Sequence, residues 1–366
     1  MNSPTQPFSN GTTYYGIYRI DSLPILVLLP HSRCNCRCLM CDIWKIRQVR
    51  EIAAADLEPH LESLRALQVR WVVFSGGEPL MHSDLAPLAG PLRAEGIRLT
   101  LLTSGLLLER HTRLVSDFFD DVIVSLDGPP AIHDQIRSVP RAFDRLAQGV
   151  KSLRRLRPDL PINARTTVQR TNCVRLRETV RTARDLKLTS ISFLAVDTTS
   201  QAFNRPDGWT RERQNTVNIG PEQVEDLALE MEALIREHAS DIDAGFIRES
   251  AEKLRGIVAY FRAQLGQIPP SSPHCNAPWV SAVVEADGTV RPCFFHRAIG
   301  NIRDNALTDV LNSEAATRFR AELDVPSNPI CQRCVCSLYV PREDVTPAAV
   351  ESEVAPETAT ELQLHV

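Results

Sequence analysis

The chain has 366 residues, a length typical of about two domains. Hydrophobic residues make up 43% and charged residues 23%, which is ordinary globular usage and excludes disordered, collagenous and coiled-coil classes. The net charge of −4 comes from 41 basic and 45 acidic side chains, so no overall field attracts nucleic acid or anionic lipid. No apolar run could cross a bilayer, and the first residues lack a signal-peptide pattern. We therefore expect a cytoplasmic protein without nucleic-acid or membrane partners.

Ten cysteines are distributed unevenly along the chain. A long chain without a secretion signal belongs in a reducing compartment, where grouped cysteines indicate metal binding rather than disulfides. Cys173 stands alone, and we expect it to be a small buried hydrophobe. The grouped cysteines are Cys34, Cys36, Cys38 and Cys41 near the start, and Cys275, Cys293, Cys331, Cys334 and Cys336 near the end.

Short apolar runs alternate with amphipathic helical stretches over the first 200 residues. This alternation predicts parallel strands joined by right-handed crossovers, hence an α/β fold that is either an open doubly wound sheet or a partial barrel. The predicted strands are Pro24–Pro30, Trp71–Phe74, Ile97–Leu102, Val122–Ser125, Ile162–Val168 and Ser190–Val196. The predicted helices include Asp56–Leu67, Asp84–Ala94, Ala142–Leu156 and Val174–Leu186.

The residues after 200 form several segments that differ in composition and predicted structure. A polar connector follows residue 200, Pro221–Leu265 is predicted to be helical, and Asp287-Gly288 predicts a hairpin within Ala282–Pro292. A short helix is expected at Thr308–Glu322. We divide the chain into an arm (1–22), the strand–helix region (23–200), a connector and helical segment (201–270), a small α+β region with cysteines (271–340) and an acidic, disordered tail (341–366).

The first cysteine group directly follows the first predicted strand. Structural zinc usually takes four ligands as two separated pairs, and no second pair or histidine lies nearby in the sequence. Cys34, Cys38 and Cys41 have the spacing C-x3-C-x2-C. Three thiolates on a four-iron cluster leave one iron open to a substrate or cosubstrate.

This triad resembles that of the radical S-adenosylmethionine (SAM) enzymes, and Cys34–Lys45 is similar to the branch with additional C-terminal clusters. Met40 stands where many members have an aromatic residue, and Cys36 replaces a usually apolar one and is expected to take no part. The resemblance implies a (β/α)6 partial barrel over about 24–196. It also implies that a reduced [4Fe–4S] cluster cleaves SAM to methionine and a 5′-deoxyadenosyl radical, which removes a substrate hydrogen atom. An external one-electron reductant, such as flavodoxin or ferredoxin, is part of this expectation.

Loops after the next three predicted strands carry matching motifs. Ser75–Leu80 resembles the family's GGEP motif, whose glutamate binds the amino group of SAM, while Thr103-Ser104-Gly105 stands where relatives often have Thr-Asn-Gly. Ser125–Gly128 resembles the family's SLDG turn, whose serine approaches SAM. All these loops follow the carboxyl ends of parallel strands, where α/β folds place active sites. The resemblance thus implies a SAM site formed by Gly76, Gly77, Glu78, Pro79, Ser104, Ser125, Asp127 and Arg137.

The second cysteine group has two possible occupants on spacing alone, a zinc ribbon or an iron–sulfur cluster. Together with Gly300-Asn301-Ile302, it resembles the SPASM or shorter twitch extension of radical SAM proteins, which implies a single auxiliary [4Fe–4S] cluster. The implied ligands are Cys275, Cys293, Cys331 and Cys334, with Cys336 as an alternative. Four protein ligands leave no open iron, which favours electron transfer.

The leading hypothesis is a radical SAM oxidoreductase that dehydrogenates a small molecule such as a sugar or aminocyclitol. Only about 23 residues precede the first predicted strand, and this favours a small molecule over a leader peptide. The alternatives are a peptide-modifying maturase of the RiPP or sulfatase type, a redox-neutral epimerase or decarboxylase, and a non-enzymatic iron–sulfur or zinc protein. The intact Gly76–Pro79 and Ser125–Gly128 loops argue against the last.

Overall fold

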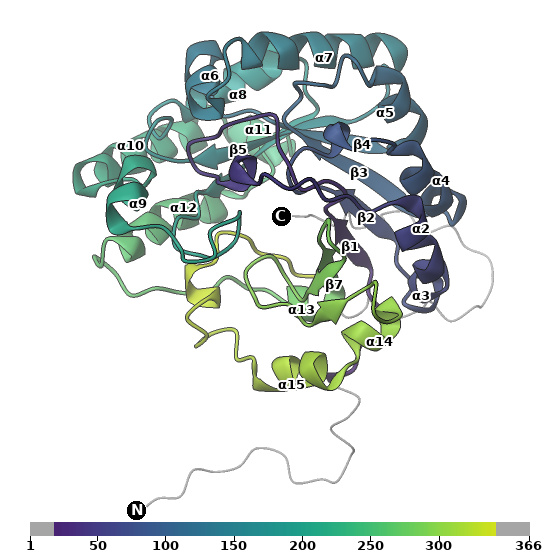
Figure 1. Cartoon of the computed structure of the whole chain (residues 1–366). Coiled ribbons are helices and arrows are strands. Elements are labelled where there is room, and N and C mark those ends of the chain that lie inside the picture. Colours follow the sequence, from purple (N-terminus) through teal and green to yellow (C-terminus); the bar gives the residue numbers. More distant parts are fainter. Residues whose placement is uncertain (1–17, 342–366) are drawn as a thin grey trace, which may run out of the picture.

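The structure, a computed structural model, describes residues 18–341 (Figure 1). Its centre is one nine-stranded sheet with the order β6-β5-β4-β3-β2-β1-β7-β8-β9. All neighbours from β6 to β7 pair in parallel, and only the last two pairs are antiparallel. The predicted α/β class with a partial barrel of parallel strands is confirmed. Most of the predicted arm and nearly all of the predicted acidic tail lie outside the described residues.

The six predicted strands agree with the structure to within a few residues. The strands are β1 Ile25–Leu28, β2 Trp71–Phe74, β3 Arg98–Thr103, β4 Asp121–Ser125, β5 Ile162–Val168, β6 Ser190–Ala195, β7 Ser281–Val284, β8 Thr289–Arg291 and β9 Gly300–Asn301. The helices are α2 Ala54–Leu57, α3 Leu61–Ala66, α4 Ala86–Ala94, α5 Thr112–Phe118, α6 Pro130–Arg137, α7 Ala142–Leu156, α8 Leu176–Asp185, α9 Arg211–Val217, α10 Pro221–Glu237, α11 Ala239–Asp243, α12 Ala251–Gln264, α13 Ala277–Val280, α14 Leu307–Leu311 and α15 Glu314–Glu322. Short 3₁₀ helices are η1 Ile43–Lys45, η2 Glu58–His60, η3 Pro79–Met81 and η4 Cys331–Arg333.

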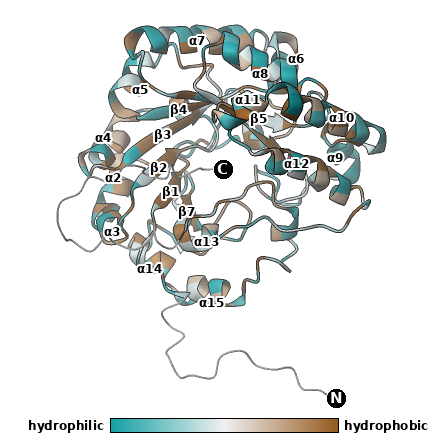
Figure 2. Cartoon of the chain, turned by 180° about the vertical axis from the view of Figure 1, so that it is seen from behind, coloured by the Kyte–Doolittle hydropathy of each residue, from teal (hydrophilic) through white to brown (hydrophobic). Residues whose placement is uncertain are grey.

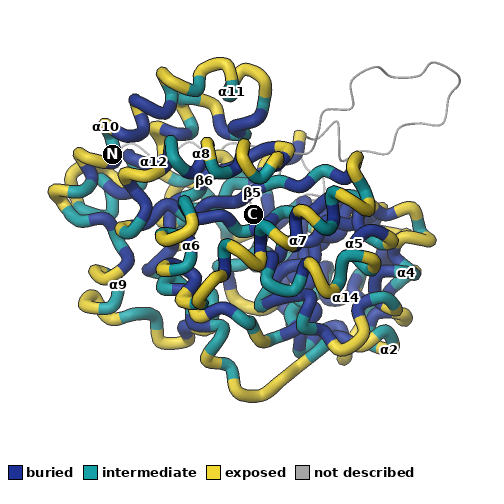
Figure 3. Tube along the Cα trace, turned by 90° about the horizontal axis from the view of Figure 1, so that it is seen from above, coloured by how far each residue is buried: buried dark blue, intermediate teal, exposed yellow. Residues whose placement is uncertain are grey.

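Helices cover the outer face of the curved sheet, and the main hydrophobic core lies between these two layers (Figures 1 and 2). Alternate strand residues such as Leu99, Val124 and Ala164 point into this core and are almost fully buried. The buried strands and the exposed outer surfaces of the helices are seen together in Figure 3. Within the described residues, no helix has both the length and the hydrophobicity that a membrane span requires.

The concave face of the sheet has an apolar half and a polar half. On β1 and β2, Ile25, Trp71 and Val73 are buried beneath the C-terminal residues Leu338 and Val340. The concave side of β4, β5 and β6 instead carries mainly polar side chains, several of them half-buried: Ile123, Ser125, Asn163, Arg165, Thr167, Ser192 and Leu194. Several side chains of the polar half are therefore partly exposed to solvent.

The C-terminal hairpin extends the same sheet instead of forming a sheet of its own. Strand β7 pairs in parallel with β1, with Leu26 opposite Ala282, and its partner β8 continues antiparallel. The hairpin was predicted from Asp287-Gly288, but this pairing joins segments more than 250 residues apart and has no local signal.

The prediction of one helix over Pro221–Leu265 is wrong, because the segment forms α10, α11 and α12. Gly245 has a φ of +71°, a left-handed conformation that ends the helical run. Ser250 then begins α12 by accepting a hydrogen bond from the Lys253 backbone N–H at 3.2 Å. The helix predicted at Thr308–Glu322 is likewise two helices, since Ser313 caps a new start at α15.

The residues between α11 and α12 run along the outer edge of β6. Ile191 donates to the Phe246 carbonyl at 2.7 Å and accepts from the Arg248 N–H at 3.0 Å. The Glu249 carboxylate accepts from the backbone N–H of Phe193 at 2.9 Å. This edge strand is therefore covered over Ile191–Phe193.

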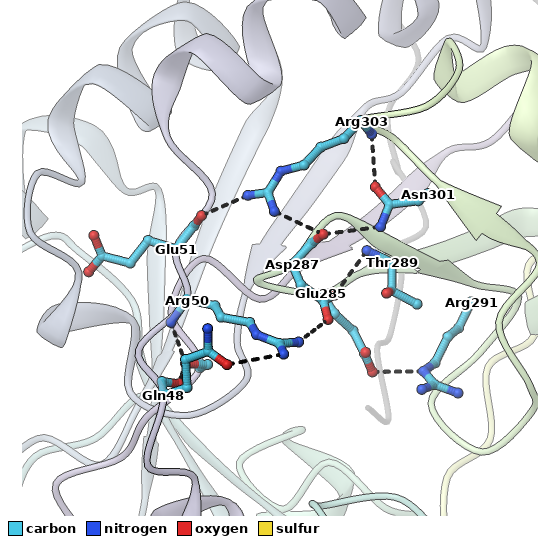
Figure 4. Close-up of polar contacts among 10 residues, drawn as sticks. Gln48, Arg50, Glu51, Glu285, Asp287, Thr289, Arg291, Asn301 and Arg303 are labelled. Carbon is cyan, nitrogen blue, oxygen red and sulfur yellow. Dashed lines mark hydrogen bonds and ion pairs between the residues drawn. The ribbon is translucent and has the colours of Figure 1, made fainter.

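Polar contacts join the loop after the first cysteines to the C-terminal hairpin (Figure 4). Arg303 donates to the carbonyls of Glu51 and Asp287, each at 3.1 Å. Arg50 forms an ion pair with the Asp287 carboxylate at 2.6 Å, and Asn301 donates to the Asp287 carbonyl at 3.1 Å. The hairpin turn is thus fixed against the loop that leaves the first cysteine group.

Candidate functional site

The first cysteine group lies in the loop between β1 and η1, at the carboxyl end of the sheet. The Cys36 backbone N–H donates to the Cys34 sulfur at 3.5 Å, and that of Ile43 donates to the Cys41 sulfur at 3.4 Å. Such donors favour a thiolate. Burial raises the pKa of the Cys41 thiol to about 12, and a metal ion that binds this sulfur displaces its proton. This donor set fits an iron–sulfur cluster.

Cys36, expected to take no part, is nearly fully buried within this loop. Its thiol hydrogen-bonds with those of Cys34 and Cys38, and the Cys34 contact is the main cause that raises the pKa of Cys36 to about 12. Cys36 is therefore a packed neighbour of the three predicted ligands.

Helix α6 anchors the cysteine loop from the side. The carbonyls of Ile136 and Arg137 accept hydrogen bonds from the backbone N–H groups of Leu39 and Arg37, at 3.0 and 3.1 Å. The Arg137 guanidinium, which is buried, lies 2.6 Å from the Asp127 carboxylate. Asp127 and Arg137, both predicted at the SAM site, thus form one buried ion pair at the back of the cysteine loop.

Glu78 is fully buried and joins the loops after β2 and β3. Its carboxylate accepts from the hydroxyls of Thr103 at 2.7 Å and Ser104 at 2.5 Å. It also accepts from the backbone N–H groups of Ser104 at 2.8 Å and Leu80 at 3.2 Å. The sequence predicts a ligand for the SAM ammonium here, and the structure adds that the chain itself supplies four donors to this carboxylate.

Gly76 and Gly77 bring the loop after β2 against the start of the cysteine loop. A Cβ on Gly77 would lie 2.1 Å from the Arg33 carbonyl oxygen, and one on Gly76 would lie 2.8 Å from the Leu29 Cβ. The Glu78 backbone N–H donates to the same Arg33 carbonyl at 2.9 Å. Pro79 is buried at the start of η3. Only glycine permits this approach.

The remaining predicted residues also lie at this end of the sheet. Ser104 Oγ lies 3.1 Å from the Asn35 side-chain amide and so joins the β3 loop to the cysteine loop. Ser125, the last residue of β4, is half-buried on the polar half of the concave face. All eight predicted SAM-site residues thus follow or end β2, β3 or β4, or belong to α6.

Contacts of Thr103, Asn35 and Gln169 were not predicted from the sequence. Gln169 is fully buried just after β5, with its amide nitrogen 3.6 Å from the Met40 sulfur. Within the described residues its amide oxygen has no hydrogen-bond partner. A single glutamine carries no motif, so no local signal could have found it.

The polar connector after β6 also reaches the cysteine loop, which the sequence did not predict. Trp209 donates from Nε1 to the Asp42 carboxylate at 2.7 Å, and Asn204 donates to the Asp42 carbonyl at 3.0 Å. Arg205, almost fully buried, forms an ion pair with Asp197 at 2.8 Å. Phe203 makes an edge-on contact with Phe295, at 6.4 Å between ring centroids.

The second cysteine group surrounds one cavity. Its wall includes all five C-terminal cysteines together with Phe295 and His296. His296 Nε2 lies 3.5 Å from the Cys331 sulfur, and the Ala277 backbone N–H donates to the Cys275 sulfur at 3.5 Å. Burial raises the pKa of Cys336 to about 12, with the nearby Arg165 charge acting in the opposite direction. A soft-sulfur cavity of this kind fits an iron–sulfur cluster. The predicted ligands Cys275, Cys293, Cys331 and Cys334 are brought together, and Cys336 lies with them.

Two segments of the chain match known domain families. Residues 28–171 match the family model of the radical SAM superfamily, and residues 275–335 match that of the SPASM iron–sulfur cluster-binding domain. These domains imply SAM, a [4Fe–4S] cluster and auxiliary clusters as cofactors. Two solved structures share the fold. One is anSMEcpe with bound AdoMet, at 19% identity and a TM-score of 0.61 over 85% of this chain and 86% of that chain. The other is Streptococcus suis SuiB bound to precursor peptide SuiA, at 16% identity and 0.60 over 87% and 72%.

Two kinds of curated relative are informative. Fe-coproporphyrin III synthase of Methanosarcina barkeri is 29% identical over 42% of this chain and 39% of its own length. A PqqA peptide cyclase of Xanthomonas campestris pv. campestris is 24% identical over 85% of this chain and 79% of its own length. The chain spans less than half of the length of these synthases. It covers 39% of Fe-coproporphyrin III synthase, 45% of an AdoMet-dependent heme synthase and 41% of a pre-heme d1 synthase. Motif loops, fold and both family matches agree, and the chain carries a radical SAM domain and a C-terminal SPASM domain.

Proposed function

We propose that the chain is a radical SAM enzyme that modifies a peptide. The observation that carries the proposal is the similarity to PqqA peptide cyclase, which extends over 85% of the chain. The similarity to the heme synthases covers only 42% to 44% of the chain. The relatives do not support the sugar or aminocyclitol dehydrogenase predicted from the cysteine spacing, whereas they support its peptide-modifying alternative.

In this proposal Cys34, Cys38 and Cys41 hold the SAM-binding cluster, which supplies the electron that cleaves SAM and so starts hydrogen abstraction. The loop at Gly76–Pro79 holds the SAM amino group through its backbone and through Glu78. Arg137 pairs with Asp127 and also contacts Cys38, so its guanidinium lies beside the cluster site. These residues bind and orient SAM in a buried loop that excludes water.

The C-terminal cysteines belong to the same proposal. Cys275, Cys293, Cys331 and Cys334 hold the auxiliary cluster, with Cys336 as the alternative ligand. Ser125 ends β4 on the polar half of the concave face, and Arg165 of β5 on the same face is within electrostatic range of Cys336, which lines the C-terminal cavity. A substrate placed there lies between the two cysteine groups. An auxiliary cluster held by these cysteines would serve as an electron acceptor, and an external flavodoxin or ferredoxin would supply electrons to the first cluster.

The test uses the full chain reconstituted anaerobically with iron and sulfide. It is incubated with SAM, dithionite and short peptides encoded beside its gene, and peptide mass and 5′-deoxyadenosine are measured together. We expect a mass change in a peptide that requires SAM and is absent from the triple variant Cys34→Ala, Cys38→Ala and Cys41→Ala. Formation of 5′-deoxyadenosine with every peptide unchanged, while coproporphyrin is consumed, would instead assign the chain to tetrapyrrole chemistry.

A further inference from the structure

A buried histidine lies against the second cysteine group. His296 follows closely after Cys293 in the chain, is only 5% exposed and belongs to the wall of the cavity that the C-terminal cysteines surround. Its Nε2 atom lies 3.5 Å from the sulfur of Cys331, a residue 35 positions further along the chain. The main chain of His296 is thus tied to one predicted cluster ligand, and its ring contacts another.

Neighbouring side chains hold His296 in this position. Phe319 of α15 meets the imidazole edge-on, with 4.9 Å between the ring centroids and an angle of 62° between the rings. Arg291 donates from Nη1 to the His296 carbonyl at 3.1 Å, and the same guanidinium is paired with Glu285 at 2.7 Å (Figure 4). Ring and main chain are therefore each positioned by a separate contact that the chain itself supplies.

The chemistry of the two atoms decides the direction of the hydrogen bond between His296 and Cys331. A cysteine that binds iron is a thiolate and carries no proton, so its sulfur can only accept. An imidazole can carry its proton on Nε2 and donate from there. The ring is therefore the donor and the Cys331 sulfur the acceptor when this cysteine holds iron.

A donor to a ligand sulfur changes how readily a cluster takes up an electron. Hydrogen bonds to the sulfurs are among the features that set the reduction potential of iron–sulfur clusters. An N–H group withdraws negative charge from the sulfur, and reduction adds negative charge, so the donor stabilises the reduced form more than the oxidised one. The Cys275 sulfur receives its donor from the main chain, the Ala277 N–H at 3.5 Å. The donor to Cys331 belongs to a side chain, and a substitution can remove it.

We propose that His296 donates a hydrogen bond from Nε2 to the Cys331 thiolate and thereby raises the reduction potential of the auxiliary cluster. His296 is a positioning residue in this proposal, because it touches a ligand and not the reacting atoms. The proposal rests on the cluster assignment made in the proposed function. It goes beyond that assignment, because it gives a residue outside the cysteine set a part in electron acceptance, whatever the substrate is.

The test is a redox titration, followed by EPR at about pH 8, of the full chain reconstituted anaerobically with iron and sulfide. The reference protein carries Cys34→Ala, Cys38→Ala and Cys41→Ala, so that the auxiliary cluster alone contributes to the spectrum. Adding His296→Leu should shift the reduction equilibrium about ten-fold toward the oxidised form, which is about 59 mV for a one-electron couple. His296→Gln, whose amide nitrogen can reach the same sulfur, should recover part of this shift.

His274→Leu is the matched control. His274 directly precedes Cys275, but it is exposed, and its ring stacks on Tyr339 with 3.8 Å between the ring centroids. At about pH 8 an exposed imidazole is uncharged, so its loss should leave the potential unchanged.

Pulsed EPR in H2O and in D2O gives a second, independent readout. The reference protein should show an exchangeable proton coupled to the cluster that His296→Leu lacks and His274→Leu keeps. A purely structural role of His296 would not predict this difference.

Iron content and urea unfolding are measured for every variant. An unchanged potential and unchanged proton couplings in an iron-loaded His296→Leu variant would overturn the proposal. If His296→Leu holds no iron, ¹⁵N-histidine in the reference protein decides. A strong nitrogen coupling would make His296 itself an iron ligand and refute the proposal, whereas a weak coupling supports it.

The outcome is separable from that of the proposed function. A reference protein that takes up zinc and no iron would overturn both the cluster assignment and the role of His296. The expected shift in potential without any modified peptide would support the role of His296 and contradict only the peptide activity.

Discussion

Arg137 places its Nη1 atom 3.6 Å from the sulfur of Cys38, a residue 99 positions earlier in the chain. The same guanidinium is paired with Asp127, and both side chains are almost inaccessible to solvent. The arginine therefore couples the motif after β4 to a predicted cluster ligand.

Replacing Arg137 by Met should lower the free energy of unfolding by about 3–5 kcal/mol, because it leaves Asp127 buried without its partner. Adding Asp127→Asn to this variant should restore part of the loss. Urea unfolding under anaerobic conditions measures both. Arg141→Met, which breaks an exposed pair with Asp144, is the matched control and should have little effect. An equally small effect at Arg137 would show that the pair is not needed.

Cysteine variants should differ in iron content according to the cluster that each replaced cysteine holds. The reconstituted chain should hold about eight irons in two four-iron clusters. The triple replacement of Cys34, Cys38 and Cys41 by Ala should remove about half of them and all SAM cleavage. Cys334→Ala should remove the other half and leave SAM cleavage without product, whereas Cys336→Ala should keep both clusters. Loss of iron in Cys336→Ala with none in Cys334→Ala would show that Cys336, and not Cys334, is the ligand of the auxiliary cluster.

Glu78→Ala should weaken SAM binding by about ten-fold or more while both clusters still assemble. It also strands the donors of Thr103 and Ser104, and each unsatisfied buried donor costs about 1–3 kcal/mol of stability. Calorimetric titration with SAM and urea unfolding report the two effects separately. SAM affinity equal to that of the parent, together with lower stability, would reduce Glu78 to a structural tie between two loops.

Gly77→Ala should destabilise the chain by about 1–3 kcal/mol and lower iron content, because its Cβ overlaps the Arg33 backbone and neither side can move away. Gly256→Ala is the matched control. Nothing lies within 4 Å of a Cβ at that helical position, so it should stabilise α12 by about 0.5–1 kcal/mol. Similar melting temperatures for the two variants would contradict the close approach.

Acid should weaken the fold through His133. Burial lowers the pKa of His133 to about 3, with the Arg137 charge adding to the effect. An unfolded histidine has a pKa of about 6.5, so between these values the unfolded chain binds the proton and the folded chain does not. Stability should therefore fall as the pH drops below about 6.5. Urea unfolding from pH 7.5 to pH 5 should show a shallower slope for His133→Gln, and parallel slopes would exclude this cause.

Local patterns were sufficient to predict the strands and the motif loops. The run Trp71–Phe74 is apolar and bounded by turn residues, and α7 has the limits Ala142–Leu156 expected from its periodicity. Local patterns failed at Gly245, where one glycine ends a long amphipathic run that otherwise continues. The candidate site likewise has a part that local patterns predict and a part that they do not. Gly77 and Glu78 carry a motif, but the contacts of Glu78 with Thr103 and Ser104 depend on strand order, which no local pattern contains.

The parallel pairing of β1 with β7 limits how the protein can be taken apart. β1 leads into the first cysteine loop and is an interior strand only because β7 covers its far side. A fragment that ends before the SPASM domain would present the hydrophobic segment Ile25–Leu28 as an open edge, with its backbone N–H and C=O groups available to other copies. Such a fragment should aggregate, and the SPASM domain should not be exchangeable between relatives without the strand it shares.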